Sequence, residues 1–251
     1  MALDRDAAAE WLRRWDAQQQ LHIPDREERF AAMVAALEAF AGHQPRVLDL
    51  GAGPGSLAAR VLTRLPAAQV VAIDTDPVLL AIARSAHAGD SRLHVVDADL
   101  RADWRSQLPL EPPFDAAMST TALHWLTLAE IVEFDSRLAS VLRPGAVFFN
   151  GDRFDFGHDQ RRIGEAVREV QRDWGPAPPG AEDWTAWWSA IEADASLVTE
   201  VAERRNRHHE HPHDDRGHTY EFHRQALLAA GFAEVATIWQ HLMNRVLIAV
   251  R

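Results

Sequence analysis

The sequence predicts an α/β fold, in which a mostly parallel sheet carries helices on both faces. Short apolar runs of strand length alternate with segments whose apolar residues recur at helical spacing. A glycine turn at 51–55 joins one such run directly to a helix, and an acid ends the next run. This alternation is typical of parallel sheets. With 251 residues, 47% of them hydrophobic, the chain is long enough for one domain, 1–251, with additions to its core.

The amino-acid composition argues against several classes of partner and chemistry. The net charge of −11 argues against a nucleic-acid backbone or an anionic membrane as partner. Cys and Lys are both absent, which excludes disulfides, thiolate chemistry, Schiff bases and a P-loop lysine. The N-terminus lacks the apolar core of a signal peptide, and no apolar run is long enough to span a bilayer. We therefore expect a soluble, cytoplasmic protein, while its oligomeric state stays open.

Two helices are predicted ahead of the first strand. Residues 4–19 place Trp11, Leu12 and Trp15 on one face, and a second helix begins at Pro24 and Asp25 and ends before Gly42. Together, residues 1–44 would form an N-terminal lid.

The stretch 47–57 reads as a buried strand, a glycine turn and a helix start. Its spacing, Gly-x-Gly-x-Gly at Gly51, Gly53 and Gly55, is one residue shorter than the dinucleotide fingerprint. Asp49 lies inside the strand end, where a carboxylate would repel a pyrophosphate but suits an ammonium group. Asp74 ends the second strand, where an acid that binds ribose hydroxyls is expected. The two acids describe a nucleoside that carries an amino acid.

This stretch resembles motif I of the class I S-adenosylmethionine (SAM) methyltransferases, and Asp74 resembles their ribose-binding acid. The resemblance covers residues 46–150 and 220–251, and it favours the small-molecule type that is similar to trans-aconitate methyltransferases. It implies a Rossmann-like seven-stranded sheet and SAM as cofactor. The cofactor-binding residues that it implies are Arg26, Arg29, Asp49, Gly51, Ala52, Gly53, Asp74, Thr75, Asp99, Leu100 and Ser119.

Two of these assignments have rivals. By resemblance, Arg26 or Arg29 could hold the SAM carboxylate, but the same arginines could line a solvated helix face. After a third strand at 92–96, Asp99 fits the acid that contacts the adenine amino group in this family; Asp97 is the alternative, and either could simply end the strand.

A fourth strand at 114–119 is followed by Leu123-His124-Trp125. This resembles the Leu-His-Trp or Leu-Gln-Trp signature of SAM enzymes that methylate small acids and alcohols. It does not resemble the Asn/Asp-Pro-Pro-Tyr signature of amino-group methylation. His124 is the candidate catalytic base, although it could equally be a packed side chain under Trp125. Thr127 caps the next helix, and Pro144 and Gly145 turn into a fifth strand at 146–150.

Residues 152–219 are additional to a plain core, and we expect a helical cap over the active site here; a packed structural insertion is the alternative. The cap supplies the candidate substrate-contacting residues, which are Trp187, Trp188, His211, His213 and His218. The histidine-rich run 208–218 is irregularly spaced and interrupted by Pro212, so we expect no metal site. A helix at 222–230 and strands at 233–239 and 246–250 complete the sheet.

The predicted function is SAM-dependent methylation of a small molecule, with O-methylation favoured over N-methylation. Three alternatives remain. One is an enzyme of the same fold that uses SAM without methyl transfer, for example by intramolecular cyclisation. Another is a non-catalytic SAM-binding protein. The third, an NAD-dependent dehydrogenase, is disfavoured by Asp49 and the glycine spacing.

Overall fold

A computed structural model describes residues 3–23, 25–172, 181–208 and 217–251. Its strands form one seven-stranded sheet in the order β3-β2-β1-β4-β5-β7-β6. They are β1 (Arg46–Leu50), β2 (Gln69–Asp74), β3 (Leu93–Asp97), β4 (Phe114–Thr120), β5 (Leu142–Arg153), β6 (Glu234–His241) and β7 (Asn244–Val250). The first five are parallel, and β7 runs antiparallel to both β5 and β6. The predicted mostly parallel, Rossmann-like sheet is therefore confirmed.

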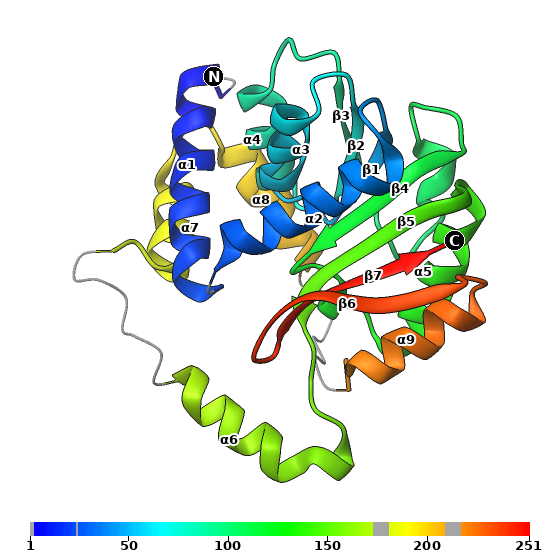
Figure 1. The fold of residues 1–251 in the computed structure, drawn as a ribbon. Helices are drawn as coiled ribbons and strands as arrows, with labels where there is room; N and C mark the ends of the chain where they lie inside the picture. The colour runs from blue at the N-terminus through cyan, green and yellow to red at the C-terminus, as the bar shows by residue number, and fades with distance from the viewer. Residues whose placement is uncertain (1–2, 24, 173–180, 209–216) are drawn as a thin grey trace.

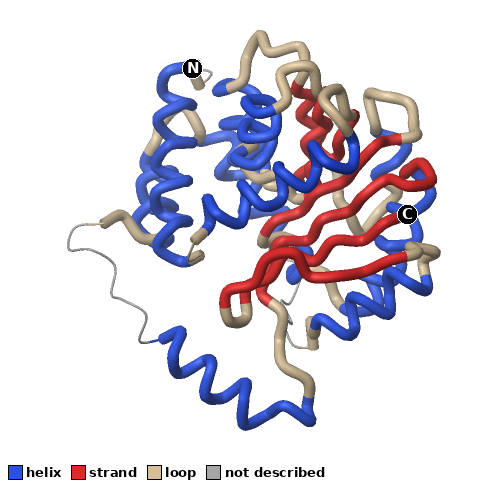
Figure 2. The backbone as a smooth tube through the Cα atoms, in the orientation of Figure 1, coloured by secondary structure: helices blue, strands red, loops and turns tan. Residues whose placement is uncertain are grey.

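Helices cover both faces of this sheet (Figures 1 and 2). In chain order, they are α1 (Arg5–His22), α2 (Arg26–Ala41), α3 (Ser56–Arg64), α4 (Pro77–Ala86), α5 (Leu128–Val141), α6 (Arg161–Arg172), α7 (Trp184–Ala193), α8 (Val198–His208) and α9 (Tyr220–Ala229). Three short 3-10 turns, η1 (Trp104–Gln107), η2 (Leu123–Trp125) and η3 (His158–Gln160), lie between them.

The alternation of side chains along the strands sorts the core into two layers. Val47 and Val70 face α2 and α3, and they share one buried cluster with Phe30 and Leu57. Their neighbours Leu48 and Val71 face the opposite way and join the cluster under α5 and α9. Because both faces are covered, the parallel strands are apolar almost throughout, as the sequence pattern requires.

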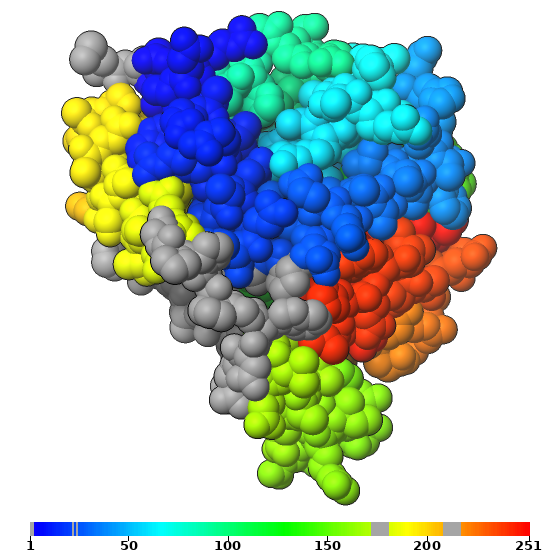
Figure 3. Space-filling view, turned by 60° about the vertical axis from the view of Figure 1, so that its left-hand side comes forward, coloured from blue at the N-terminus to red at the C-terminus, as the bar shows by residue number. Residues whose placement is uncertain are grey.

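A third layer joins the N-terminal helix to the cap. Trp11 and Trp15 of α1 pack edge to face on Trp187 of α7, with ring centroids 5.7 and 5.0 Å apart. Val78 and Ile82 of α4 and Leu197 and Val201 beside α8 complete this tryptophan layer. Figure 3 shows α1 and the yellow cap helices side by side on one flank of the molecule. Helix α1 of the lid and helices α7 and α8 of the cap, far apart in sequence, thus form one packed unit on α4.

Element boundaries follow the predicted signals closely. Asp76 accepts hydrogen bonds from the amides of Val78 and Leu79 and caps α4, and Thr127 forms a capping box with Glu130. The fifth strand is longer than predicted. It continues past residue 150 because Asp152 and Arg153 pair with β7, although these polar residues carry no apolar strand signal.

The cap region contains α6, α7 and α8, which confirms its predicted helical character. Helix α6 stands away from the sheet and projects at the bottom of Figures 1 and 3. Within the described part of the chain, no helix is long and apolar enough to cross a membrane.

Candidate active site

The glycine turn after β1 is held against the end of β2 and against η2. The amides of Gly51 and Ala52 both donate to the carbonyl of Ile73, at 2.8 and 2.9 Å. Gly51 has φ +70°, and a Cβ placed on it would lie 2.2 Å from the Cβ of Ala122. Only glycine therefore fits here, and the residues after β4 lie directly against the turn.

Asp49 is a buried acid at the end of β1. It is 1% exposed, and its Oδ2 accepts a hydrogen bond from the amide of Ala58 at 3.0 Å. Its Oδ1 has no hydrogen-bond partner among the described residues. Burial raises the pKa of Asp49 to about 7. A buried carboxyl oxygen without a donor fits an ammonium group, as the sequence predicts.

Asp74 accepts hydrogen bonds from the glycine turn and from the residues that follow β2. Its Oδ2 accepts from the amide of Gly53 at 2.7 Å, and its Oδ1 accepts from Thr75 and Asp76 at 2.7 and 2.8 Å. Burial raises the pKa of Asp74 despite these bonds. The carboxylate thus lies at the junction of the glycine turn and the β2 end, where ribose hydroxyls would be bound.

The two rival acids after β3 have different surroundings. Asp97 forms a two-pronged ion pair with Arg207 of the cap helix α8, at 2.7 and 2.8 Å. Asp99 pairs with its neighbour Arg101 at 2.9 Å, and Leu100 is buried in the core beside it. Both acids are therefore ion-paired, Asp97 with the cap and Asp99 with its own neighbour in the chain.

The structure distinguishes the two lid arginines, and it excludes a solvated face because both are buried. Arg26 donates to Asp16 at 2.9 Å and stacks over Phe30, so its charge is already paired. Arg29 is fully buried and donates from Nη2 to the Thr120 hydroxyl at 2.6 Å. Its Nε and Nη1 have no partner among the described residues, and burial lowers its pKa to about 10.

Asp49 and Arg29 together test whether the site suits the implied cofactor. A buried carboxyl oxygen and a buried guanidinium, each with unused hydrogen-bonding capacity, match the ammonium and carboxylate of an amino acid. The donor set therefore fits the methionine end of SAM. Ser119 does not add to it directly, because its buried hydroxyl donates to the Leu50 carbonyl at 2.8 Å. Ser119 instead fastens β4 to the strand end that precedes the glycine turn.

His124 in η2 lies against the end of β5. Its Nδ1 is 2.9 Å from Oδ1 of Asp152, and the histidine side chain is 27% exposed while that of Asp152 is 4% exposed. Burial alone would push the pKa of Asp152 up, but His124, the Arg153 amide and Arg29 outweigh it and lower the pKa. His124 is therefore oriented by an ionised acid, although its ring also lies 5.6 Å from that of Trp125.

A second pair of imidazoles lies beside this one. His218 is 2% exposed, and its Nδ1 is 3.1 Å from Nε2 of His223 in α9. Burial lowers the pKa of both, to about 4 for His223, so this pair is neutral at physiological pH. The charges of Asp152 and His124 both act on His218, so this histidine lies near the His124–Asp152 pair.

The other predicted cap residues are placed differently. Trp187 is fully buried in the tryptophan layer, and Trp188 packs against it while Arg204 stacks over its ring at 3.6 Å. These two residues pack the cap onto the lid, because large apolar rings are stabilised most by full burial. His211 and His213 lie outside the described residues. Among the described residues, no group of acids and histidines is arranged to hold a metal ion.

Sequence reasoning missed four residues of this region, namely Thr120, Asp152, Arg207 and His223. Asp152 lies just beyond the apolar part of β5, and His223 lies on a helix that reads as plain core. The positions of both residues depend on the surrounding structure. Pairing with β7 extends β5 as far as Asp152, and His223 lies on the buried face of α9. A polar residue that directly follows a central apolar strand is the signal that could have identified Asp152.

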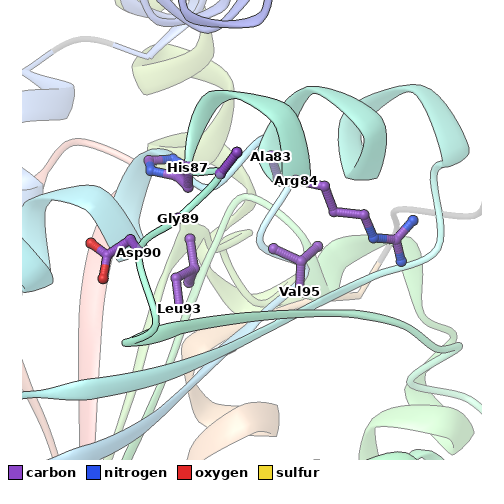
Figure 4. A pocket seen from close by; sticks show the side chains of 8 residues that line it. Ala83, Arg84, His87, Gly89, Asp90, Leu93 and Val95 are labelled. Atoms are coloured by element: carbon purple, nitrogen blue, oxygen red, sulfur yellow. The ribbon is translucent and has the colours of Figure 1, made fainter. Parts of the chain in front are cut away.

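A surface hollow of about 200 Å³ lies elsewhere, between the end of α4 and the beginning of β3 (Figure 4). Ala83, Arg84, His87 and Leu93 are among its lining residues. Leu93 is the first residue of β3, so this hollow is remote from the strand ends that carry the polar groups described above.

Comparisons with known proteins agree with this geometry. A family model described as a methyltransferase domain matches residues 47–145. Trans-aconitate 2-methyltransferase of Methylobacterium nodulans is 37% identical over 131 residues, which cover 52% of this chain and 46% of the relative. The protein of the same name from Azoarcus is 30% identical over 168 residues, or 66% and 60% of the two chains. The chain thus matches about half the length of these relatives.

Solved structures share the fold at low sequence identity. The SAM-dependent methyltransferase SibL has a TM-score of 0.55 at 17% identity, over 97% of this chain and 69% of its own. Magnesium protoporphyrin IX methyltransferase of Synechocystis, solved with bound SAM, has a TM-score of 0.50 at 18% identity, over 89% and 78%. Residues 47–145 thus match a methyltransferase domain, and this match, the named relatives, the glycine turn, Asp49 and Asp74 together support a class I S-adenosylmethionine-dependent methyltransferase.

Proposed function

We propose that this protein transfers the methyl group of SAM to an oxygen atom of a small molecule. The observation that carries this proposal is the contact between Gly51 and Ala122. It holds the turn that carries His124 and Trp125 against the glycine turn of the cofactor site. This proximity supports a role in acceptor binding for the Leu123-His124-Trp125 stretch, which resembles the signature of enzymes that methylate small acids and alcohols.

The cofactor would be held by the residues around the strand ends. Asp49 and Arg29 would bind the ammonium and carboxylate of its amino acid part, and Asp74 would bind the ribose. Asp99 would contact the adenine, and the backbone of residues 51–53 would form the floor of the cofactor site. When bound, SAM supplies an electrophilic methyl group that in-line displacement can transfer. The chain's own contribution is to position the acceptor and keep water out.

The relatives support an oxygen acceptor. Two that match this chain are named as trans-aconitate 2-methyltransferases, which act on a carboxylic acid. The acidic surface composition and the absence of any membrane-crossing helix among the described residues agree with a small substrate.

The test is product analysis of the full chain with SAM and trans-aconitate, a second set of small hydroxy acids, and a set of primary amines. We expect S-adenosylhomocysteine to form with an acid or a hydroxy acid. Methylthioadenosine would indicate SAM cyclisation instead. SAM binding without any product, across all three sets, would indicate a non-catalytic SAM-binding protein.

A further inference from the structure

The strand ends beyond the cofactor turn carry an acid–imidazole pair that a carboxylate acceptor does not need. The Nδ1 of His124 is 2.9 Å from the buried carboxylate of Asp152. A carboxylate is already a nucleophile when ionised, so its methylation requires no base. A hydroxyl must lose its proton as the new bond forms. The pair therefore bears on which oxygen is methylated.

Asp152 is built into the fold in a way that fixes this arrangement. Asp152 lies in β5, opposite Arg245 of β7 in the strand register. Its Oδ1 also accepts a hydrogen bond from the Arg153 amide at 2.8 Å. An ionised acceptor at Nδ1 selects the tautomer in which Nδ1 carries the proton. The lone pair of that tautomer is on Nε2, so the ring nitrogen that can accept a proton is the one turned away from Asp152.

The charged groups described around Asp152 keep this acid ionised beside His124. Arg29 faces Asp152 from α2, and the Arg153 amide faces it along β5. His218 and His223 face it from the segment before α9 and from α9, and Asp155 acts on His218. The edge-to-face contact of His223 with Phe154, at 5.2 Å, keeps this imidazole pair in an apolar setting. The neutral pair adds no positive charge that would oppose protonation of His124.

We propose that the acceptor is a hydroxyl group that His124 deprotonates, and that Asp152 is the residue that positions His124 for this role. The inference rests on the proposed methyl transfer. The acceptor oxygen forms a bond to the methyl carbon while the carbon–sulfur bond breaks. The electron pair of that bond goes to sulfur, and the hydroxyl proton goes to Nε2 of His124. No oxidant, reductant or metal is needed for this balance.

The first test needs no acceptor. Long-range ¹H–¹⁵N NMR spectra of the full chain at pH 7.5, with His124 assigned by comparison with His124→Gln, report its tautomer. We expect a proton on Nδ1 and none on Nε2, and a loss of this preference in Asp152→Asn. A proton fixed on Nε2, or the same tautomer ratio in Asp152→Asn, would overturn the role assigned to Asp152.

The second test uses acceptors that carry both kinds of oxygen, namely 4-hydroxybenzoate and small hydroxy acids, with trans-aconitate as the carboxylate-only comparison. Mild alkali hydrolyses a methyl ester and leaves a methyl ether intact. We expect alkali-stable ethers. Methyl esters alone, or methylation of trans-aconitate with none of the hydroxyl compounds, would overturn the inference and leave the proposed function standing.

The variants then separate catalysis from folding. General base catalysis contributes about 10²- to 10⁴-fold in rate. We expect kcat for ether formation to fall by this amount in His124→Gln, with SAM affinity unchanged, and by at least tenfold in Asp152→Asn. We also expect the lost rate to recover as pH rises. His43→Gln is the matched control, because the side chain of His43 is 80% exposed.

Equal pH profiles for Asp152→Asn and the unaltered protein would contradict the inference. Failure of every acceptor to yield S-adenosylhomocysteine would count against the proposed function, while the NMR result would still decide the inference.

Discussion

Both terminal nitrogens of Arg207 in the cap donate to the carboxylate of Asp97 at the end of β3, and the same guanidinium donates to the Thr75 carbonyl at 2.8 Å. One side chain of α8 thus bridges the ends of β2 and β3, next to the acids proposed to bind ribose and adenine. Arg204, one turn earlier, donates to Asp76 at 2.6 Å. The cap is fastened to the cofactor side of the sheet by charge as well as by the tryptophan layer.

We predict that Arg207→Met speeds SAM dissociation and increases amide hydrogen exchange in α8. The ion pair is partly exposed, so its contribution is limited to about 1 kcal/mol, or about fivefold in rate. Stopped-flow displacement of SAM and hydrogen exchange mass spectrometry measure the two effects. Arg205→Met is the matched control, because Arg205 lies on the same helix and pairs with Glu192 at 3.2 Å on the surface. Equal effects of the two variants would show that the bridge to β3 is unimportant.

We predict that Asp74→Asn lowers SAM affinity by about 10- to 100-fold, because a hydrogen bond to a charged group contributes about 1.5–3 kcal/mol. Asp74→Ala should lower SAM affinity further, because this variant also lacks the hydrogen bond from the Gly53 amide that shapes the turn. Calorimetric titration provides the affinities. Asp90→Asn, at the surface hollow, should bind SAM normally. Unaltered affinity in Asp74→Ala would contradict the assignment of the cofactor site.

Asp49 should make SAM binding and stability respond to pH in opposite ways. Its folded-state pKa of about 7 exceeds the unfolded value of about 3.9, so the folded protein binds the extra proton between these values. Its contribution to the free energy of unfolding therefore falls as pH rises from 4 to 7. SAM affinity should rise over pH 6–8, because the ionised form pairs with the ammonium.

Asp49→Asn provides the check. The variant should be more stable than the unaltered protein above pH 7, by about 1–4 kcal/mol given about 1.4 kcal/mol per pKa unit, and no more stable near pH 4. Its SAM affinity should be low at every pH. Urea unfolding at several pH values and calorimetric titration measure these quantities. A stability difference that does not change between pH 4 and 8 would contradict the raised pKa.

His223 should contribute an acid sensitivity of the opposite sign. Its folded-state pKa of about 4 lies below the unfolded value of about 6.5, so the unfolded chain binds more protons between them. Stability should thus fall as pH drops from 6.5 towards 4. His223→Leu should remove about 1–3 kcal/mol of this fall, seen as a pH-dependent difference in urea unfolding, while His43→Gln should follow the unaltered protein. A constant difference across that range would argue against a neutral, buried His223.

Local patterns allowed the sheet and the cofactor turn to be predicted, because they act over a few residues. The glycine turn, the cap at Asp76 and the apolar strands each depend on near neighbours, and all appear where expected. Arg29 and Asp49 stay predicted cofactor-binding residues, and the sequence could not tell Arg29 from Arg26. Their difference arises from Asp16, which pairs with Arg26 across a helix junction.

Contacts between distant segments could not be predicted in this way. Asp152 meets His124 through strand register and the position of η2, and Arg207 meets Asp97 across 110 residues. Trp187 was expected to face a substrate and instead packs on Trp11 and Trp15. An aromatic residue on a helix has the same sequence pattern in either setting, so only the packing of α1 against α7 distinguishes them.

The tryptophan layer also orders events during synthesis. Trp11 and Trp15 leave the ribosome well before the rings that cover them, because Trp184 and Trp187 follow about 170 residues later. Translation proceeds at about 5–20 residues per second, so α1 waits roughly 10–30 seconds with part of its apolar face uncovered. The nascent chain can complete its central strands in this interval. Helix α1 is thus made long before its full set of partners, and a chaperone that binds exposed apolar surface would find it there.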